Sequence, residues 1–587
     1  MVKGFQYINK LHVIIYFILS IIMGLMPIVN IIIMQYIIDN MANVLNKTLV
    51  IKSIIIWVIF LFSIQITQSA ISFFHELIII KMQKIINLQI YADFINKCDE
   101  IEYKYFEKKD IYDKIRLVKN SLNGMHIGLV KSIASLFSLC ISIIGVFLII
   151  LPAGWHIVTI TIITAVPVWL LVFHFNVKQA KGWTETHMKL SKTNYYSDQI
   201  KSRKTIKETR IFNTFNFFGL LWEREFDNYN YGLIRMTLTA RLGSAISMFL
   251  QCLVLGLIII LLLNPLLDSI ITIGFFVAVL EGVRSFTGNF TWRFNHAING
   301  LTRNKEIYNA YAQILNHHTK LENGIGKAKL EEVFTNPLLE VKDLWFRYNE
   351  EQDYILKGLN LVIHKGEQVA IVGVNGCGKS TFVKLLLGFY KPDKGTIRLN
   401  GIDPTCFTRE ERKMIFAVVF QDFVRYEISL RENLAIPDLN TISNDDYLIS
   451  SLNAVDGGQI LQHVKSLEAI LGKKINEGVD ISNGQWQKLS LARALMKDYC
   501  FTVLDEPTSA MDPLVEVEVF KYFAKLSANK SGVFITHRLG AIQFVDRIFV
   551  LDHGMILEEG KHQELMDNNN LYAEMYKMQK QGLNNEY

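Results

Sequence analysis

The stretch Gly366–Tyr390, GEQVAIVGVNGCGKSTFVKLLLGFY, places an apolar run, a glycine-rich loop and a helix-forming segment in direct succession. Gly373 to Ser380 match the pattern GxxxxGKS/T. Glycines let backbone N–H groups curve around phosphates, and the N-terminus of the following helix attracts negative charge. The apolar run Val369–Val372 predicts the buried strand that such a loop follows. The stretch therefore predicts an α/β nucleotide-binding domain.

Two side chains of this loop have predicted roles of their own. Lys379 can reach the β- and γ-phosphates of ATP, and the Ser380 hydroxyl can ligate Mg²⁺. The residues expected to contact the nucleotide here are Gly373, Asn375, Gly376, Cys377, Gly378, Lys379, Ser380 and Thr381.

A second acidic site follows in FTVLDEPTSAMDP, residues 501–513, where an apolar strand ends in Asp505 and Glu506. ATP hydrolysis needs a carboxylate near the metal and a group that orients water. Ligands of α/β sheets bind at the carboxyl ends of the strands, where these two side chains lie. Two adjacent carboxylates at the end of a parallel strand therefore suit these two roles.

The rest of the chain has the composition of a membrane protein. Of its 587 residues, 50% are hydrophobic and 20% are charged, and the excess of apolar residues lies before about Phe290. A helix needs roughly 20 apolar residues to span the hydrocarbon core. Six segments qualify, the sixth being interrupted by Glu281 and Arg284: 13–38, 53–75, 127–151, 156–175, 242–263 and 270–290.

The predicted fold class is an all-α six-helix transmembrane domain followed by an α/β P-loop ATPase domain with a helical subdomain. The predicted domains are residues 1–320, with two long cytoplasmic loops, a linker at 321–336 and an ATP-binding domain at 337–587. The long loops 76–126 and 176–241 are rich in Lys and Arg and the short ones are not, which places the long loops and both termini in the cytoplasm.

The long loops also predict where the two domains communicate. We expect helices that extend below the membrane, with tips near Lys109–Ile115 and Asn213–Phe217. Glu281 and Arg284 favour an i,i+3 ion pair over a functional site within the sixth span. The net charge of +6 does not suggest nucleic acid, and the six cysteines lack metal-ligand spacing and are expected to be free thiols.

With these motifs in order, the chain resembles the ATP-binding cassette (ABC) transporters over essentially its whole length. The resemblance implies an adenine-stacking role for Tyr348, a contact with Mg²⁺ for Gln421 and a switch role on the γ-phosphate for His537. It also implies that Ser482, Gly484 and Gln485, in the signature segment ISNGQWQKLSLARA (residues 481–494), contact the nucleotide of the opposite subunit, and that Asp512 lies in a dimer-contact loop. The implied catalytic residues are Glu506, His537 and Gln421, and the implied metal ligands are Ser380, Gln421 and Asp505.

One position departs from the family pattern LSGGQ, because Asn483 replaces the first glycine. If that position requires φ > 0, Asn is the least costly substitute, although efficient turnover by the site would be in doubt. The stretches QDFVRY, GQWQK and KETRIFN look like those of bacterial exporters of lanthipeptides and related ribosomal peptides.

The resemblance implies ATP-driven export across the bacterial plasma membrane, with alternating access in a dimer. A full transporter needs two such halves, which favours a homodimer and leaves a heterodimer open. The implied partners are the second half-transporter, membrane lipid and an exported substrate, most plausibly a peptide. Efflux of drugs or lipids is an alternative, and an ATP-gated regulator without bulk transport is an alternative of another class.

Overall fold

The computed structural model describes residues 10–45, 51–121, 125–203, 205–315, 338–473, 477–496, 499–506, 530–536, 542 and 545–584. The chain divides into two compact units. Unit 1 comprises Met1–Ile101 and Lys108–His318, and unit 2 comprises Glu102–Glu107 and Thr319–Tyr587. The predicted linker, 321–336, lies outside the described residues.

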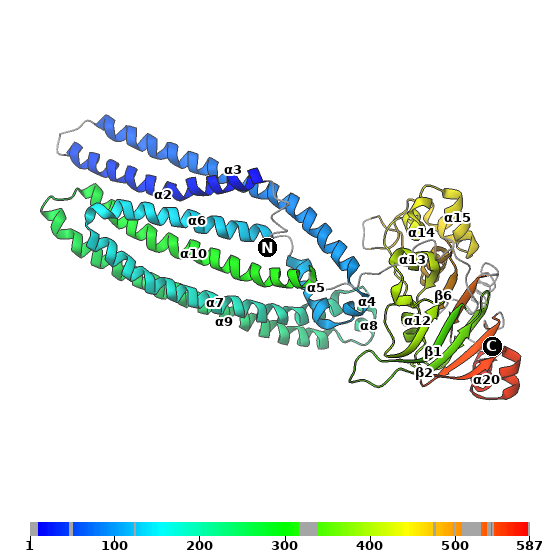
Figure 1. Ribbon diagram of the computed structural model, residues 1–587. Helices are drawn as coiled ribbons and strands as arrows, with labels where there is room; N and C mark the ends of the chain where they lie inside the picture. The colour runs from blue at the N-terminus through cyan, green and yellow to red at the C-terminus, as the bar shows by residue number, and fades with distance from the viewer. Residues whose placement is uncertain are drawn as a thin grey trace. The chain divides into compact units, whose positions relative to one another are not determined.

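Unit 1 is helical throughout its described part (Figure 1). Its helices are α2 (Lys10–Leu45), α3 (Ile51–Glu100), α5 (Lys109–Ser121), α6 (Met125–Ile150), α7 (Trp155–Lys201), α8 (Ile206–Ile211), α9 (Phe215–Leu267) and α10 (Ile273–Leu315), with a short 3-10 turn, η1 (Leu151–Ala153), before α7. Helix α7 packs along α9 and α6 along α10, while α2 contacts α3, α6 and α10.

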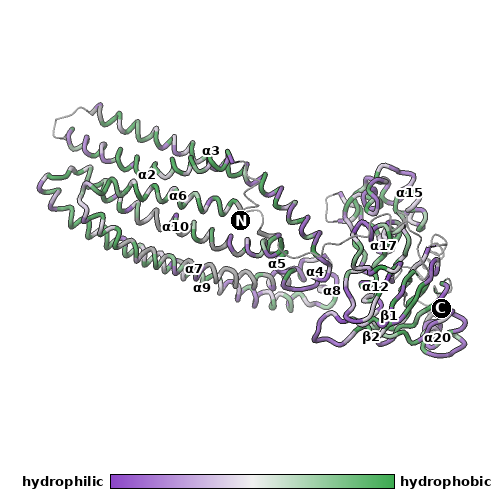
Figure 2. The backbone as a smooth tube through the Cα atoms, in the orientation of Figure 1, coloured by the Kyte–Doolittle hydropathy of each residue, from purple (hydrophilic) through white to green (hydrophobic). Residues whose placement is uncertain are grey.

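Four of the predicted spans fall within long helices, namely α2, α3, α7 and α9. The other two overlap α6 and α10, but the span 127–151 runs one residue past the end of α6 and the span 270–290 begins three residues before α10. Within the described residues, four helices are long and apolar enough to cross a membrane, and these are α2, α3, α6 and α9. Membrane crossing by α7 and α10 stays a prediction. Figure 2 shows the hydrophobic character along α2 and α6, in contrast to the hydrophilic α5. Pro27 and Pro167 lie inside continuous helices.

Apolar side chains pack the interior of unit 1 and also cover much of its outside. Val146, Ile258 and Val279, from α6, α9 and α10, belong to one buried cluster. Exposed side chains such as Ile66 of α3 and Leu148 of α6 are large and apolar. Lipid tails accept such a surface at no cost, and the helical backbone satisfies its own hydrogen bonds.

Asp39 joins the end of α2 to the start of α10. One carboxylate oxygen accepts a hydrogen bond from the backbone N–H of Gly274 at 2.8 Å, and the other accepts one from the Thr272 hydroxyl at 3.0 Å. The first N–H groups of a helix have no partner within the helix, and a carboxylate there also suits the helix dipole. A side chain of one helix thus caps its neighbour.

Unit 2 is built on a six-stranded sheet in the order β5-β6-β7-β3-β8-β9, which is parallel except for the pairing of β8 with β9. Its strands are β3 (Gln368–Val372), β5 (Phe416–Val419), β6 (Phe501–Asp505), β7 (Ser531–Ile535), β8 (Arg547–Asp552) and β9 (Met555–Gly560). Every residue of β3, β6 and β7 is buried, as expected for parallel strands covered on both faces.

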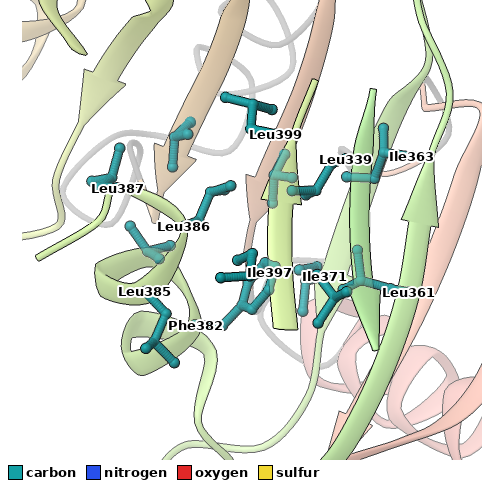
Figure 3. Packing of buried hydrophobic residues seen from close by; sticks show 14 of the residues in the cluster. Leu339, Leu361, Ile363, Ile371, Phe382, Leu385, Leu386, Leu387, Ile397 and Leu399 are labelled. Atoms are coloured by element: carbon teal, nitrogen blue, oxygen red, sulfur yellow. The ribbon is translucent and has the colours of Figure 1, made fainter. Parts of the chain in front are cut away.

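A second sheet is antiparallel, with β1 (Leu339–Phe346) between β2 (Leu356–Ile363) and β4 (Lys394–Leu399). Helix α12 (Lys379–Leu386) packs between the two sheets, where Phe382 and Leu386 meet Ile371 and Ile397 in one cluster (Figure 3). The remaining helices of unit 2 are α4 (Tyr103–Phe106), α13 (Arg409–Ile415), α14 (Leu430–Ala435), α15 (Asp445–Ala454), α16 (Gly458–Val464), α17 (Asn483–Leu495), α19 (His562–Asn568) and α20 (Leu571–Asn584), and its 3-10 turns are η2 (Pro404–Cys406) and η3 (Leu439–Thr441).

Asp39→Ala should lower the free energy of unfolding by about 1 kcal/mol, the usual loss when a helix cap is removed. The midpoint of thermal unfolding of the full chain in lipid nanodiscs measures this. Asp268→Ala is the control, because that side chain, at the end of α9, has no hydrogen-bond partner among the described residues. Equal losses in the two variants would contradict the capping role.

Candidate active site

The glycine-rich loop connects β3 to α12, as its sequence predicts. Gly376 and Gly378 have backbone φ angles of 85° and 113°, which residues other than glycine rarely adopt. The Lys379 ammonium folds back and donates hydrogen bonds to the carbonyl oxygens of Gly373 at 2.8 Å and Val374 at 3.0 Å. A buried ammonium at a helix N-terminus adds positive charge where the helix dipole is already positive. The loop is thus arranged for an anion.

Asp505 lies at the carboxyl end of β6 and provides the acidic side of the site. Burial raises the pKa of Asp505 to about 6, although a hydrogen bond from Ser380 and the charge of Lys379 act in the opposite direction. Its Oδ1 atom is buried and has no hydrogen-bond partner among the described residues. A carboxylate oxygen without a partner, beside a hydroxyl, is a donor set that suits Mg²⁺. The residues present therefore fit the metal.

Glu506 and Gln421 meet although they are far apart in the sequence. The Gln421 Nε2 atom donates a hydrogen bond to the Glu506 Oε2 atom at 2.8 Å. Glu506 follows β6 with a φ angle of 46°, and its backbone N–H bonds to the carbonyl oxygen of Ile535 at 2.9 Å. This left-handed turn directs Glu506 away from the strand. The structure thus brings together three predicted site residues, Asp505, Glu506 and Gln421.

Tyr348 lies beside the start of α12. Its hydroxyl is 3.3 Å from the Thr381 hydroxyl, and its ring meets the Phe346 and Tyr390 rings edge to face at 5.2 and 5.3 Å. The ring is half-buried and keeps a free part of its surface. This is a position from which an aromatic ring can stack on a base bound to the loop.

The signature segment forms the first turn of α17. The backbone N–H of Gln485 bonds to the Ser482 hydroxyl at 3.2 Å, and that of Ser482 bonds to the Gln485 Oε1 atom at 2.9 Å, which is a capping box. Asn483 is the first residue of the helix and is absent from the described residues with positive φ. The backbone at this position therefore does not require a glycine, and the effect of Asn483 on turnover stays a prediction. A Cβ on Gly484 would meet nothing within 4 Å.

Arg493 ties α17 to the segment that carries Gln421. Its guanidinium donates hydrogen bonds to the Val424 carbonyl and to the Asn433 Oδ1 atom, both at 2.9 Å. Asn433 in turn donates to the Tyr426 carbonyl at 2.9 Å. Burial lowers the pKa of Arg493 to about 10. Sequence reasoning missed this residue, because a buried arginine gives no local pattern.

Sequence reasoning also missed a network at the far end of α12. The Lys384 ammonium donates to the Glu107 Oε1 atom at 2.8 Å and lies 5.2 Å from the centre of the Tyr348 ring. Tyr390 also bonds to Glu107. Burial raises the pKa of Glu107, but its hydrogen bonds with Lys384, Tyr390 and Tyr103 outweigh this and hold the pKa below its usual range.

The segment Glu102–Glu107 groups with unit 2, whereas both expected helix tips, Lys109–Ile115 and Asn213–Phe217, belong to unit 1. Contact of these tips with the ATPase domain stays a prediction. Two other predicted residues, Asp512 and His537, lie outside the described residues. All six cysteines are free thiols, as expected. Glu281 and Arg284 form the expected i,i+3 pair, with 3.6 Å between Oε2 and Nε.

The fold and this site define an ATP-driven membrane exporter of the ABC class, in which ATP hydrolysis is coupled to transport. Residues 13–290 match the profile of the ABC transporter transmembrane region, and residues 356–509 match that of the ABC transporter domain. The chain therefore belongs to the ABC transporters, as a half-unit with fused membrane and ATPase parts. It is a multi-pass membrane protein with a cytoplasmic ATPase domain.

Among proteins of known name, the chain is similar to the subtilin transport ATP-binding protein SpaT of Bacillus subtilis, with 28% identity over 95% of this chain and 90% of that protein. It is also similar to the nisin transport ATP-binding protein NisT of Lactococcus lactis subsp. lactis, with 28% identity over 97% of this chain and 94% of that protein. A solved structure of a bacterial Atm1-family ABC exporter with ATP bound shares the fold, with a TM-score of 0.78, 18% identity and coverage of 96% of this chain and 98% of that chain.

Arg493→Met should destabilise the protein by about 2–3 kcal/mol, because two hydrogen bonds to a buried charged group are lost and the Asn433 amide oxygen loses its partner. Chemical unfolding of the full chain in nanodiscs, followed by circular dichroism, measures this loss. Arg425→Met is the matched control, since Arg425 is an exposed arginine of the same segment. A loss in Arg493→Met no larger than in the control would show that the link is not structural.

Proposed function

We propose that the chain exports a ribosomally made peptide as a homodimer, with its termini and ATPase domain on the cytoplasmic side. The main support is that SpaT and NisT, whose names refer to subtilin and nisin transport, align with both the membrane part and the ATPase part of this chain. Unit 2 supports ATP hydrolysis as the energy source of this export, because Glu506, Gln421 and Asp505 lie together beside the glycine-rich loop.

In the proposed reaction, the loop N–H groups hold the phosphates of ATP. Lys379 leaves the carbonyl oxygens of Gly373 and Val374 and turns to the phosphates. Mg²⁺, when bound, would offset the charge of the phosphates. Ser380, Asp505 and Gln421 would hold it. Tyr348 stacks on the adenine.

Glu506 is proposed to orient the attacking water and to accept its proton. The water oxygen bonds to the γ-phosphorus as the bond to the β-phosphate oxygen breaks, which leaves ADP and phosphate. Gln421 donates a hydrogen bond to the Glu506 carboxylate and would also be a ligand of the metal. His537 is proposed to contact the γ-phosphate, and Asp512 is proposed to lie in a loop that contacts the second subunit. Ser482, Gly484 and Gln485 of a second subunit would close over the nucleotide.

Glu506→Gln should leave ATP binding intact and lower hydrolysis at least about 100-fold, because the amide cannot accept the proton of water. Lys379→Ala should instead lose nucleotide binding. Filter binding of labelled ATP and phosphate release, both on the full chain in nanodiscs, separate the two effects. Near-normal hydrolysis by Glu506→Gln would refute its assignment, and normal ATP binding by Lys379→Ala would refute the site.

Inside-out vesicles that contain the wild-type chain should accumulate precursor peptides encoded beside its gene, and only when ATP is present. Mass spectrometry of the vesicle lumen measures the transport, with Glu506→Gln vesicles as the control. Accumulation of drugs or flipping of lipids without peptide uptake would contradict the peptide substrate. ATP hydrolysis without transport of peptides, drugs or lipids would favour the alternative of an ATP-gated regulator.

A further inference from the structure

Unit 1 contains a cavity of about 370 Å³ that none of the motifs explains. It lies among α2, α3, α6 and α10, and Tyr16, Ser20, His75, Glu76, Lys131 and Arg293 are in its wall. Four ionisable side chains from three helices thus share one space in the membrane part of the chain. Such groups are costly in a membrane and are retained for a function or for pairing with one another.

On the α2 side, side-chain contacts between α2 and α3 form the wall of the cavity. The His75 ring stacks on the Tyr16 ring with 4.1 Å between centres, and the His75 Nε2 atom is 2.9 Å from the Ser20 hydroxyl. Tyr16 and Ser20 are buried. Gly24 lets α2 approach α6 closely, because a Cβ there would lie 2.7 Å from the carbonyl oxygen of Ser138. The cavity is therefore built by packed helices.

Neither cation of the cavity has a carboxylate partner among the described residues. Half-buried Arg293 donates a hydrogen bond from its Nη1 atom to the Ser138 hydroxyl at 3.3 Å, and most of its five N–H donors have no other partner among those residues. Among the described residues, no carboxylate lies within 4 Å of Arg293 or Lys131. Glu76 balances only one of the two charges. A half-buried guanidinium without a counter-ion is unfavourable, so the cavity favours an anionic ligand.

The position of the cavity along α6 and α10 indicates which side of the membrane it lies near. Lys131 is 19 residues before the end of α6, and Arg293 is 20 residues after the start of α10. At about 1.5 Å per residue, both lie about 30 Å from the ends that meet the short loops, which is the thickness of the hydrocarbon core. With the orientation predicted from the loop charges, the cavity lies at the cytoplasmic boundary of the membrane.

We propose that this cavity is an entry site for the substrate and binds a carboxylate of the exported peptide through Arg293 and Lys131. The inference rests on the proposed export of a peptide. A guanidinium presents parallel N–H groups that match a carboxylate, and the apolar and aromatic parts of the wall can take neighbouring side chains. The headgroup of an anionic lipid is the competing anion, and the test separates the two.

The test uses nucleotide-free full-length chain in nanodiscs of phosphatidylcholine and two peptides with an uncharged fluorescent label. One peptide is Leu-Asp-Leu-Asp-Leu amide, and the other has Asn in place of Asp. Fluorescence anisotropy should show the acidic peptide binding about tenfold more tightly, and Lys131→Gln with Arg293→Gln should reduce this ratio to about one, because two charge-assisted contacts are lost. Arg293→Lys should keep much of the preference, since it keeps the charge.

Arg235→Gln is the matched control, because it removes one exposed positive charge of unit 1 from α9, outside the cavity. The preference should persist in this variant, and basal ATP hydrolysis should persist in all of them, which confirms folding. Equal binding of the two peptides by wild type, or an unchanged preference in the double variant, would overturn the proposal.

A further arm repeats the measurement in nanodiscs that contain phosphatidylglycerol. A preserved preference supports a peptide site, whereas its abolition identifies a lipid-headgroup site and overturns the proposal. Failure of wild type to hydrolyse ATP or to transport peptide would count against the proposed function, and binding in the nucleotide-free state is measured independently of both.

Discussion

Positive charge concentrated at the start of α12 is the constraint on which the ATPase unit depends. Lys379 is the first residue of that helix, where the dipole already disfavours a cation, and it is almost fully buried. Two carbonyl oxygens of the loop compensate in part. Across the same edge of the sheet, Asp505 is buried, and one of its oxygens has no hydrogen-bond partner in the part of the chain that the structure describes. A bound phosphate and its metal would offset both of these unfavourable placements of charge.

The same edge depends on contacts between distant segments. Arg493 connects the signature helix α17 to the segment after Gln421, and Gln421 itself bonds to Glu506. Few contacts therefore separate α17 from the Glu506 carboxylate. At the opposite end of α12, Lys384 lies between the Tyr348 ring and the Glu107 carboxylate. Helix α12 therefore connects the nucleotide site to Glu107, which lies directly before unit 1 in the sequence.

The parts of the site that follow a local pattern could be predicted from sequence. The glycine-rich loop and the Asp505–Glu506 pair have fixed spacings set by phosphate and metal chemistry, and the long apolar runs predict helices. Glu107 could not be found in this way, because its partner Lys384 is 277 positions away and neither residue belongs to a pattern. The backbone conformation at Asn483 could not be derived from its residue type either, because it depends on where α17 begins.

In helix α10, the charged residues that interrupt the apolar run are not the charged residue that lacks a carboxylate partner. Glu281 and Arg284 interrupt the apolar run and are conspicuous in the sequence, yet they form an exposed pair with each other. Arg293 lies beyond the predicted span, but it is half-buried, and its partner among the described residues is a hydroxyl group. The cost of a charge depends on its burial and on its partners, and neither can be derived from the residues adjacent in sequence. A membrane arginine is therefore better judged by its missing counter-ion than by its position in a hydropathy profile.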